Sequence, residues 1–471
     1  MRVPPPQWGT ESVTSLRTAS LLQTRLDEFV GRVQSETRVP GIGVAVSLAG
    51  TRLYACAGTR AVGESLPLTS ETRFHLGCAG KLLLAMTALE LENRGAVATT
   101  AAIGEYLSEL RGSLHGDAVR VSHLLSHTSG YRGTNILDPE MRSLTWQGLV
   151  GYLRSAPRLF APGSVFSYEH TESVLLGEIL RRSIGKPYDQ LIDETILQPL
   201  GITSAAHGPS ARRANEAGRH RFDERVNRFV ALDAVAVQPL WHAAFAERTA
   251  SLGELLSIGE AAIGERAGAA GGQIASAATR RNLQRTVVRL PATVGGPLRE
   301  LLPVAFGLGA AELREGFHGN TGVSAGQCLG IRFDEQLRVC VAVGLNAMVP
   351  YLRDFVLTAV CRDLADRPVA DQPDEPFGFE LADLAGAYFG PGSSTVEVRY
   401  DDGRLVCSIG RELARDRLRV ELALDDEGRA VLRSPLPHLS LGFFRELGGD
   451  VGLMLGLAAY KRGSTERPFQ R

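Results

Sequence analysis

Apolar and polar positions follow two different periods in the first hundred residues, which predicts both helices and strands. Apolar side chains recur every three or four positions from Leu21 to Val33, a spacing typical of an amphipathic helix. Two short apolar runs follow at 42–48 and 52–57, and Ala49-Gly50-Thr51 between them predicts a β-hairpin. A second, more apolar helix is predicted from Cys78 to a C-terminal cap near Gly95.

The middle of the chain has a helical pattern, and strand patterns return after it. Residues 100–245 are mostly helical with long loops, and Phe306-Gly307-Leu308-Gly309 opens a second set of strands. Apolar runs at 323–333 and 337–345 predict another hairpin, followed by a helix from about 349 to 364. We therefore predict an α/β fold, in which the early and late strands form one antiparallel sheet flanked by helices, with a mostly helical subdomain.

A proline-rich and acidic stretch separates this region from a C-terminal part with a different pattern of apolar and polar residues. Residues 366–376 hold three prolines and four acidic residues, which is typical of a linker. Beyond it, alternating runs such as 395–400 and 404–409 are joined by the turn Asp401-Asp402-Gly403 and predict a small antiparallel β domain. The expected divisions are a flexible leader at 1–20, an α/β domain at 21–367, a linker at 368–376 and the β domain at 377–471.

Composition excludes several classes of function. The 471 residues carry a net charge of −1, which gives no global field favouring nucleic acid or an anionic membrane. No apolar run approaches the ~20 residues of a membrane span, and the N-terminus lacks the apolar core of a signal peptide, so a cytoplasmic location is expected. The six cysteines are widely spaced, and neither a metal, a disulfide framework nor another cofactor is expected. Arginine-rich residues 208–230 predict an exposed loop or an excursion of the subdomain.

One short stretch combines a nucleophile with a possible base. In Gly77-Cys78-Ala79-Gly80-Lys81 the thiol and the amine are three residues apart, so they share one face of a helix. A position at a helix N-terminus beside a cation favours a thiolate. Lysine occurs at only three positions among 51 basic residues, which favours a chemical reason for Lys81. The alternative is a buried structural cysteine with an incidental lysine.

Three further segments follow this stretch along the chain: Leu124-Leu125-Ser126-His127-Thr128-Ser129-Gly130, Tyr168-Glu169-His170 and Gly319-Asn320-Thr321-Gly322. The order and the separations of the four segments fit the pattern of one protein family. Over residues 25–365 the chain thus resembles the serine β-lactamase and penicillin-binding-protein superfamily, in its class C and esterase branch. The tail resembles the lipocalin-like β domain that is often fused to such proteins.

The resemblance implies a role for each matched residue. Cys78 takes the place of the nucleophilic serine, Lys81 that of its activating lysine, and Tyr168 that of the proton-accepting tyrosine. The backbone N–H groups of Cys78 and Val323 would form the oxyanion hole. The implied pocket residues are His170, Asn320, Thr321 and Gly322.

Three departures from the family pattern affect the expected chemistry. Cys78 replaces serine, His170 replaces asparagine, and Asn320 replaces a basic residue that holds a substrate carboxylate in family members. Binding of a penicillin-like or peptide carboxylate is therefore in doubt. His170 could orient the site, act as a second base, or form only a polar pocket wall.

The cysteine changes the expected reaction. A thiol needs less help from a base than a hydroxyl, and its acyl intermediate is a thioester, which reacts more readily with amines than with water. The leading hypothesis is a biosynthetic acyltransferase (transacylase) that uses a small-molecule acyl donor and acceptor, as the family's intracellular transacylases of antibiotic biosynthesis do. The alternatives are a cysteine-dependent esterase, amidase or peptidase, and a non-catalytic protein that keeps the fold for binding. The oligomeric state is left open.

Overall fold

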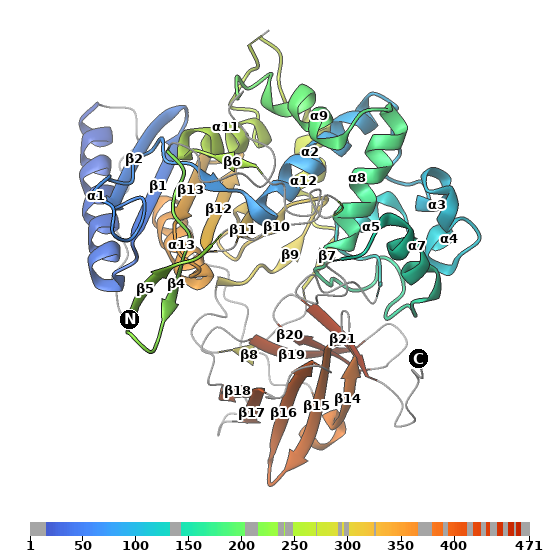
Figure 1. Cartoon of the computed structure of the whole chain (residues 1–471). Helices are drawn as coiled ribbons and strands as arrows, with labels where there is room; N and C mark the ends of the chain where they lie inside the picture. Colours follow the sequence, from blue (N-terminus) through green and yellow to red (C-terminus); the bar gives the residue numbers. More distant parts are fainter. Residues whose placement is uncertain are drawn as a thin grey trace. The chain divides into compact units, whose positions relative to one another are not determined.

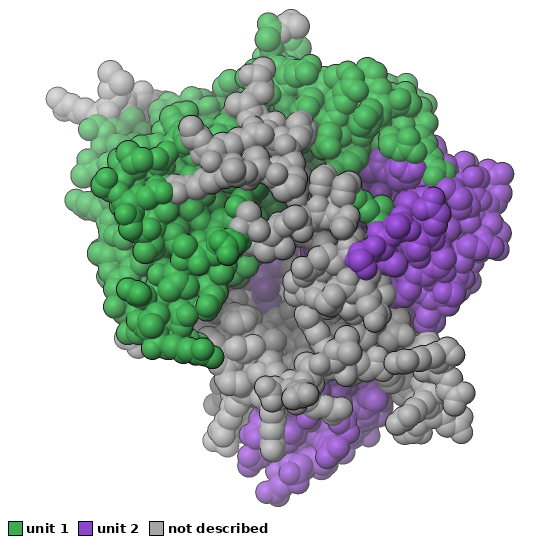
Figure 2. Space-filling model, viewed as in Figure 1, with its two compact units in different colours: residues 1–97, 180–285, 308–369 green, residues 98–179, 286–307, 370–471 purple. Residues whose placement is uncertain are grey.

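The computed structural model shows an α/β protein built from two compact units (Figures 1 and 2). Unit 1 combines residues 1–97, 180–285 and 308–369, and unit 2 combines residues 98–179, 286–307 and 370–471. The structure describes residues 16–131, 143–202, 215–233, 240, 248–269, 271–290, 294–295, 301–324, 326–365, 379–389, 394–411, 418–424, 430–433, 440–445, 451–455 and 458–462. The predicted linker at 368–376 and most of the predicted leader lie outside the described residues.

Unit 1 contains the predicted antiparallel sheet. Its strands in spatial order are β2 (Thr51–Gly58), β1 (Gly41–Leu48), β13 (Val339–Leu345), β12 (Gln327–Asp334), β11 (His318–Ser324) and β10 (Ala311–Glu312). The early hairpin pairs with the last strand, since Val44 lies opposite Val343. Every residue of β1, β12 and β13 is buried, as expected for strands covered on both faces. The prediction that early and late strands share one sheet flanked by helices is confirmed.

Alternate residues of β1 face different helices. Ile42, Val44 and Val46 belong to one apolar core together with residues of α1 (Leu16–Thr37) and α13 (Pro350–Ala365). On the opposite face, a side chain added at Gly43 would collide with Leu252 of α11 (Leu252–Ala262). α1 begins at Leu16, five residues before the predicted start. The prediction began too late because the first turn of α1 carries no apolar repeat in the sequence.

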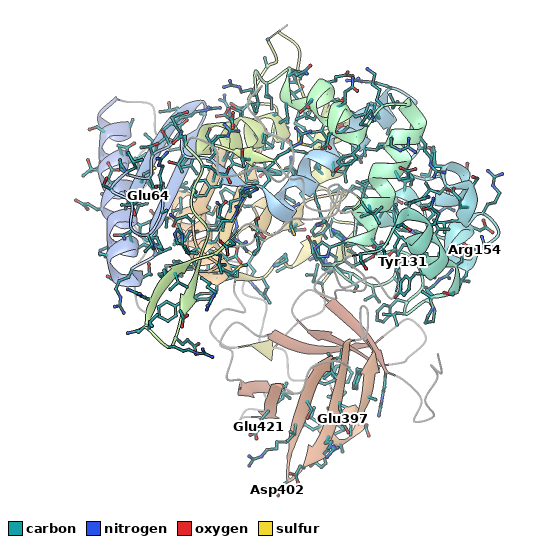
Figure 3. All side chains as sticks on the ribbon, viewed as in Figure 1. Glu64, Tyr131, Arg154, Glu397, Asp402 and Glu421 are labelled. Carbon is teal, nitrogen blue, oxygen red and sulfur yellow. The ribbon has the colours of Figure 1, made fainter. Side chains whose placement is uncertain are left out.

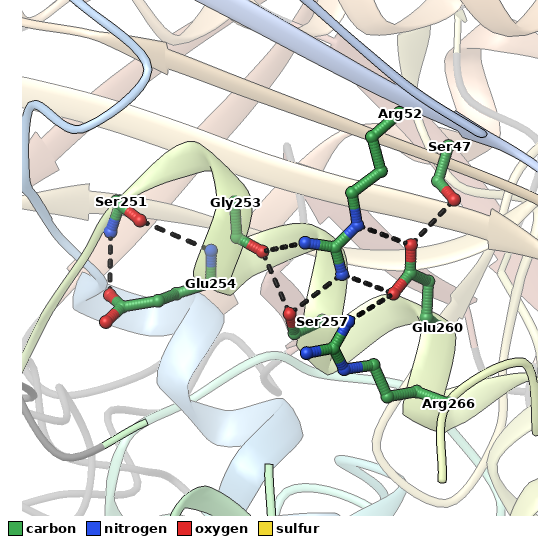
Figure 4. A network of polar contacts seen from close by, with 8 residues as sticks. All are labelled: Ser47, Arg52, Ser251, Gly253, Glu254, Ser257, Glu260 and Arg266. Atoms are coloured by element: carbon green, nitrogen blue, oxygen red, sulfur yellow. Dashed lines mark hydrogen bonds and ion pairs between the residues drawn. The ribbon is translucent and has the colours of Figure 1, made fainter. Parts of the chain in front are cut away.

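A polar network joins α11 to the sheet (Figure 4). The Glu260 carboxylate is only 3% exposed and accepts hydrogen bonds from Ser47 Oγ at 2.7 Å and Arg52 Nε at 2.9 Å. Arg52 also donates to Ser257 Oγ at 2.9 Å, and Arg266 lies 3.8 Å from Glu260. A buried carboxylate is tolerated only when its oxygens are satisfied in this way. The network therefore fixes the position of α11 against β1 and β2.

A second buried ion pair lies at β12. The side chains of Arg332 in β12 and Glu315 in the loop before β11 are each 2% exposed and form a hydrogen-bonded ion pair. Arg332 also donates to Thr358 Oγ1 of α13 at 2.8 Å. The hydrogen bond to Thr358 connects β12 to α13.

Unit 1 has further elements outside the sheet. They are β3 (Phe74–His75), the 3₁₀ turn η1 (Gly77–Gly80), α2 (Lys81–Asn93), α9 (Tyr188–Ile192), the π-helical turn η3 (Asp193–Leu197), β4 (His220–Asp223), β5 (Arg228–Ala231), β6 (Thr249–Ala250) and α12 (Ala277–Gln284). β4 and β5 form a hairpin within the stretch predicted to be an exposed loop or an excursion of the subdomain, so the loop alternative is wrong for residues 220–230.

Unit 2 contains the predicted helical subdomain. Its elements are α3 (Ile103–Tyr106), the 3₁₀ turn η2 (Ser108–Leu110), α4 (Leu114–Ala118), α5 (Val121–Leu125), α7 (Trp146–Ser155), most of α8 (Thr171–Ile184), and the paired short strands β7 (Val288–Arg289) and β9 (Ala305–Phe306). In the described part of the chain, no helix has both the length and the apolar character needed to cross a membrane.

The C-terminal residues of unit 2 form the predicted all-β structure. Its strands in spatial order are β18 (Ala430–Arg433), β17 (Leu418–Leu424), β16 (Arg404–Arg411), β15 (Ser394–Asp401), β14 (Gly386–Phe389), β21 (Ala458–Arg462), β20 (Val451–Leu455), β19 (Ser440–Arg445) and β8 (Val294–Gly295). A 3₁₀ turn, η6 (Leu381–Leu384), precedes them.

The turn between β15 and β16 forms as predicted (Figure 3). Asp402 and Gly403 have φ values of 45° and 77°, the two positive values of a type I′ hairpin turn. The edge strand β8 was not predicted, because it comes from residues 294–295, far outside the alternating C-terminal pattern.

Candidate active site

Cys78 lies in a turn between a buried strand and the central helix of unit 1. The chain leaves β3, forms the 3₁₀ turn η1 and continues directly into α2. Cys78 is thus in the 3₁₀ turn, and the α-helix proper begins at Lys81, three residues later than predicted. The Lys81 backbone N–H donates to the Cys78 carbonyl oxygen. With three residues per 3₁₀ turn, Cys78 and Lys81 lie on the same side, as the sequence spacing predicted.

The two side chains differ in exposure. Lys81 is 6% exposed, and the next ten residues of α2 are buried too. Cys78 is half-buried. Burial of an amine is costly unless polar groups compensate it, so packing alone does not explain a lysine at this position.

The other cysteines contrast with Cys78. Cys328 and Cys340 are core residues, 1% and 0% exposed. Burial raises the pKa of Cys328 to about 11 and that of Cys56 to about 12. These two thiols therefore remain protonated near neutral pH. All six cysteines of the chain are thiols rather than disulfides.

The turn that carries Cys78 lies directly against strand β11. Gly77 has φ +50°, and a Cβ atom there would lie 2.5 Å from the Val323 carbonyl oxygen and 3.2 Å from the Val323 nitrogen. A Cβ atom on Gly322 would lie 1.9 Å from the Leu76 carbonyl oxygen. Both glycines are therefore needed for this approach. The structure places Val323, whose N–H is a predicted oxyanion donor, at the residue preceding Cys78.

Asn320 is hydrogen-bonded to the backbone near this contact. Its Nδ2 donates to the Gly309 carbonyl oxygen at 3.3 Å, and its Oδ1 accepts from the Thr321 N–H at 3.0 Å. Gly309 in turn touches α2, since a Cβ atom there would lie 2.2 Å from the Ala85 Cβ. Asn320 thus connects β11 to a segment packed on the central helix. A role of Asn320, Thr321 and Gly322 in binding substrate stays a prediction.

Arg353 is a residue of this region that the sequence analysis missed. It is 4% exposed, and its Nη1 donates to the Gly322 carbonyl oxygen at 3.0 Å. Its Nε and Nη2 donate to the two carboxylate oxygens of Asp354, each at 2.8 Å. Burial opposes the charge, but the carboxylate of Asp354 raises the pKa of Arg353 above its ordinary value. The Arg-Asp pair at 353–354 was the available signal, although the same helix carries a second such pair at 362–363.

Tyr168 and His170 lie together in unit 2. The Tyr168 ring centroid is 4.6 Å from that of His127 and 5.6 Å from that of His170. The backbone also holds this segment, because the Ser167 N–H donates to the His127 carbonyl oxygen at 2.8 Å. Tyr168 is therefore flanked by two imidazole rings.

A buried carboxylate orients His127. The His127 and Glu172 side chains are 5% and 1% exposed, and His127 Nδ1 is hydrogen-bonded to Glu172. The other Glu172 oxygen accepts from the Ser129 N–H at 3.2 Å. His127 has φ +54°, a conformation uncommon outside glycine. From the sequence, this segment contributes only to the resemblance, and neither His127 nor Glu172 has a predicted role.

The predicted site residues therefore form two groups. Cys78, Lys81 and the β11 residues 320–323 lie together in unit 1, and Tyr168 with His170 lies in unit 2. That Tyr168 approaches Cys78 and Lys81 stays a prediction. Among the described residues, no group of three or more His, Cys, Asp or Glu side chains is arranged to hold a metal ion.

Comparison with known proteins identifies the family. The model of the Beta-lactamase family matches residues 22–360. The chain belongs to the Beta-lactamase family. A beta-lactamase of Providencia stuartii is 25% identical over 191 residues, which are 41% of this chain and 48% of that protein. The chain spans about half the length of the curated relatives it matches.

Solved structures show the same fold. SurE superimposes with a TM-score of 0.72 at 21% identity, covering 94% of this chain and all of that one. A class C beta-lactamase mutant superimposes with a TM-score of 0.60 at 20% identity, covering 76% of this Beta-lactamase family chain and 100% of its own. The resemblance inferred from the motifs, and the fold class that it implied, are confirmed.

Proposed function

We propose that this member of the Beta-lactamase family is an acyltransferase that forms a thioester on Cys78 and passes the acyl group to an amine or another acceptor. The proposal is supported by the family membership, since acyl-enzyme chemistry is the common property of beta-lactamases and penicillin-binding proteins. It is also supported by the half-buried thiol in the turn against β11, with a buried lysine one turn away.

The proposed reaction has two steps. In the first, Cys78 Sγ attacks the carbonyl carbon of an ester or thioester donor, and Lys81 with Tyr168 accepts the thiol proton. The bond from the carbonyl carbon to the donor's leaving group breaks, and the leaving group takes the proton. In the second, the acceptor attacks the Cys78 thioester, loses a proton to the same residues and releases the thiol. In both steps the carbonyl oxygen becomes an oxyanion, for which the N–H groups of Cys78 and Val323 are the proposed donors.

The observation that best supports the proposal is the close contact between β11 and the turn η1, which contains Cys78. Gly77 and Gly322 permit backbone contacts that no side chain would allow, so the turn and the strand are fitted to each other. A cysteine kept only for packing would not need this arrangement, because the packed cysteines of the unit lie inside strands and helices.

The test is mass spectrometry of the full chain after incubation with N-acetylcysteamine thioesters of amino acids and short peptides. SurE was crystallised with D-Leu, so donors ending in a D-residue are the first to try. The expected result is a single acyl adduct that maps to Cys78 and is absent in Cys78→Ala. Cys56→Ala is the matched control, because Cys56 is the other half-buried cysteine, and it should still form the adduct.

The fate of the adduct separates transfer from hydrolysis. Transfer predicts that a primary amine discharges the thioester faster than water at the same pH, with formation of the corresponding amide. Loss of the adduct at the same rate with and without amine would favour the hydrolase alternative, which the beta-lactamase relatives support. No adduct from any donor, together with a Cys78 thiol as unreactive as Cys56 toward alkylating reagents, would favour the non-catalytic alternative.

A further inference from the structure

We propose that Arg353 is a positioning residue that fixes and polarises the peptide bond between Gly322 and Val323, and so strengthens the Val323 N–H as an oxyanion donor. The inference rests on the proposed function, since it assigns a residue to the oxyanion hole of the same acyl transfer. Arg353 acts through the backbone and touches no reacting atom.

The geometry follows from the two ends of one peptide group. Arg353 Nη1 lies 3.0 Å from the Gly322 carbonyl oxygen, and the N–H of the same peptide group belongs to Val323. In a trans peptide the C=O and the N–H point in opposite directions. The Val323 backbone nitrogen and carbonyl face Gly77, the residue before Cys78. The Arg353 guanidinium therefore holds the carbonyl end of the peptide group, and the nitrogen end faces the turn η1 that contains Cys78.

The position of Arg353 is itself fixed. Asp354 accepts two hydrogen bonds from its guanidinium, which leaves Nη1 directed at the Gly322 oxygen. Arg353 is 4% exposed, so solvent screens its charge little. Strand pairing also holds Gly322, which lies opposite Leu329 of β12.

A cation on the carbonyl oxygen draws electron density from the peptide nitrogen toward that oxygen. The N–H then becomes a stronger donor, and the peptide plane resists rotation. Hydrogen bonds in a chain strengthen one another in this way, by roughly 10–30% for each bond. Loss of a whole oxyanion donor lowers a rate about 10²- to 10³-fold. Weakening and loosening one donor should therefore lower the acylation rate by roughly 3- to 30-fold.

The experiment compares two reactions of Cys78 in the full chain. Acylation by an N-acetylcysteamine thioester develops an oxyanion, and alkylation by iodoacetamide does not. Arg353→Lys keeps the charge but cannot hold Asp354 with two bonds and reach Gly322 as well. We expect this variant to slow acylation 3- to 30-fold while alkylation changes less than twofold. Arg332→Lys, the same change at a buried arginine of strand β12, should alter both rates equally or not at all.

Two further measurements keep the proposal testable if Arg353→Lys does not fold. Asp354→Asn loosens the guanidinium without removing it and should slow acylation but not alkylation. Labelling with ¹³C-carbonyl glycine and ¹⁵N-valine marks only the peptide groups 43–44 and 322–323, the two Gly-Val pairs of the sequence. The Val323 amide signal should shift in Asp354→Asn, and the Val44 signal should not.

The outcomes separate this inference from the proposed function. If the wild-type chain is acylated on Cys78 and the Arg353 and Asp354 variants are acylated equally fast, the inference is wrong and the proposed function stands. If acylation and alkylation fall together, Arg353 supports only the fold, and the inference is again wrong. If wild-type Cys78 accepts no acyl group while the Val323 signal shifts as expected, the proposed function fails and the polarised peptide remains.

Discussion

Replacing Gly77 with alanine should slow acylation of Cys78 much more than the strain alone explains. Gly77 has φ +50°, and a left-handed conformation costs a residue with a Cβ atom about 1–2 kcal/mol. The added Cβ would lie 2.5 Å from the Val323 carbonyl oxygen, whereas ordinary contacts begin at 3.4 Å. The turn and β11 must therefore separate by about 0.9 Å. A misplacement of about 1 Å can cost 10²-fold in rate, so we expect acylation to fall by roughly 10- to 100-fold.

Gly95→Ala is the matched control, because it adds the same strain without the collision. Gly95 follows the C-terminal end of α2, has φ +72°, and has no atom within 4 Å of an added Cβ. Both variants should lose about 1–2 kcal/mol of unfolding free energy in urea from the left-handed backbone, and Gly77→Ala should lose more through the collision with Val323. Only Gly77→Ala should lose acylation, measured by mass spectrometry as adduct formed against time. Equal acylation rates in the two variants would refute the claim that the close contact between η1 and β11 positions the Cys78 thiol.

Three further outcomes follow from buried polar groups. Glu315→Gln leaves Arg332 without its charged partner in the core and should lower the free energy of unfolding by about 3–5 kcal/mol; a loss below about 1 kcal/mol in urea titration would contradict the pairing. Glu172→Gln weakens the hydrogen bond to His127 and should cost about 1.5–3 kcal/mol, measured in the same way. Burial chiefly lowers the pKa of His115 below 6.5, so the folded state binds this proton less readily than the unfolded state. Stability should therefore decline as the pH falls below 6.5, and His115→Gln should flatten the decline in melting temperature between pH 7 and pH 5.

The sheet was predictable because its strands carry local signals. Residues 42–48 and 52–57 are apolar runs around a glycine turn, and they match β1 and β2 within a residue or two. The helix predicted at 349–364 matches α13 equally well. The boundary between β11 and β12 was missed, since the single run predicted at 323–333 ignores the small and polar residues at 324–327, where the chain turns.

Other features depend on contacts that no local pattern records. The hairpin of β4 and β5 lies in an arginine-rich stretch whose composition is typical of a loop. Cys78, Lys81, Tyr168 and His170 were predicted from motifs. The role proposed for Arg353 rests on its contact with a backbone carbonyl 31 residues away, and a sequence does not show which backbone carbonyl a side chain will contact.

The edge strand β8 limits how the C-terminal part of the protein can be cut. Ser440 and Leu441 of β19 pair with residues 294–295, which precede the C-terminal residues by more than a hundred positions. A fragment beginning at the linker would present the bare edge of β19 to solvent, and unpaired edges promote aggregation. Transfer of this β structure to another protein must therefore include residues 294–295 as well as the C-terminal strands.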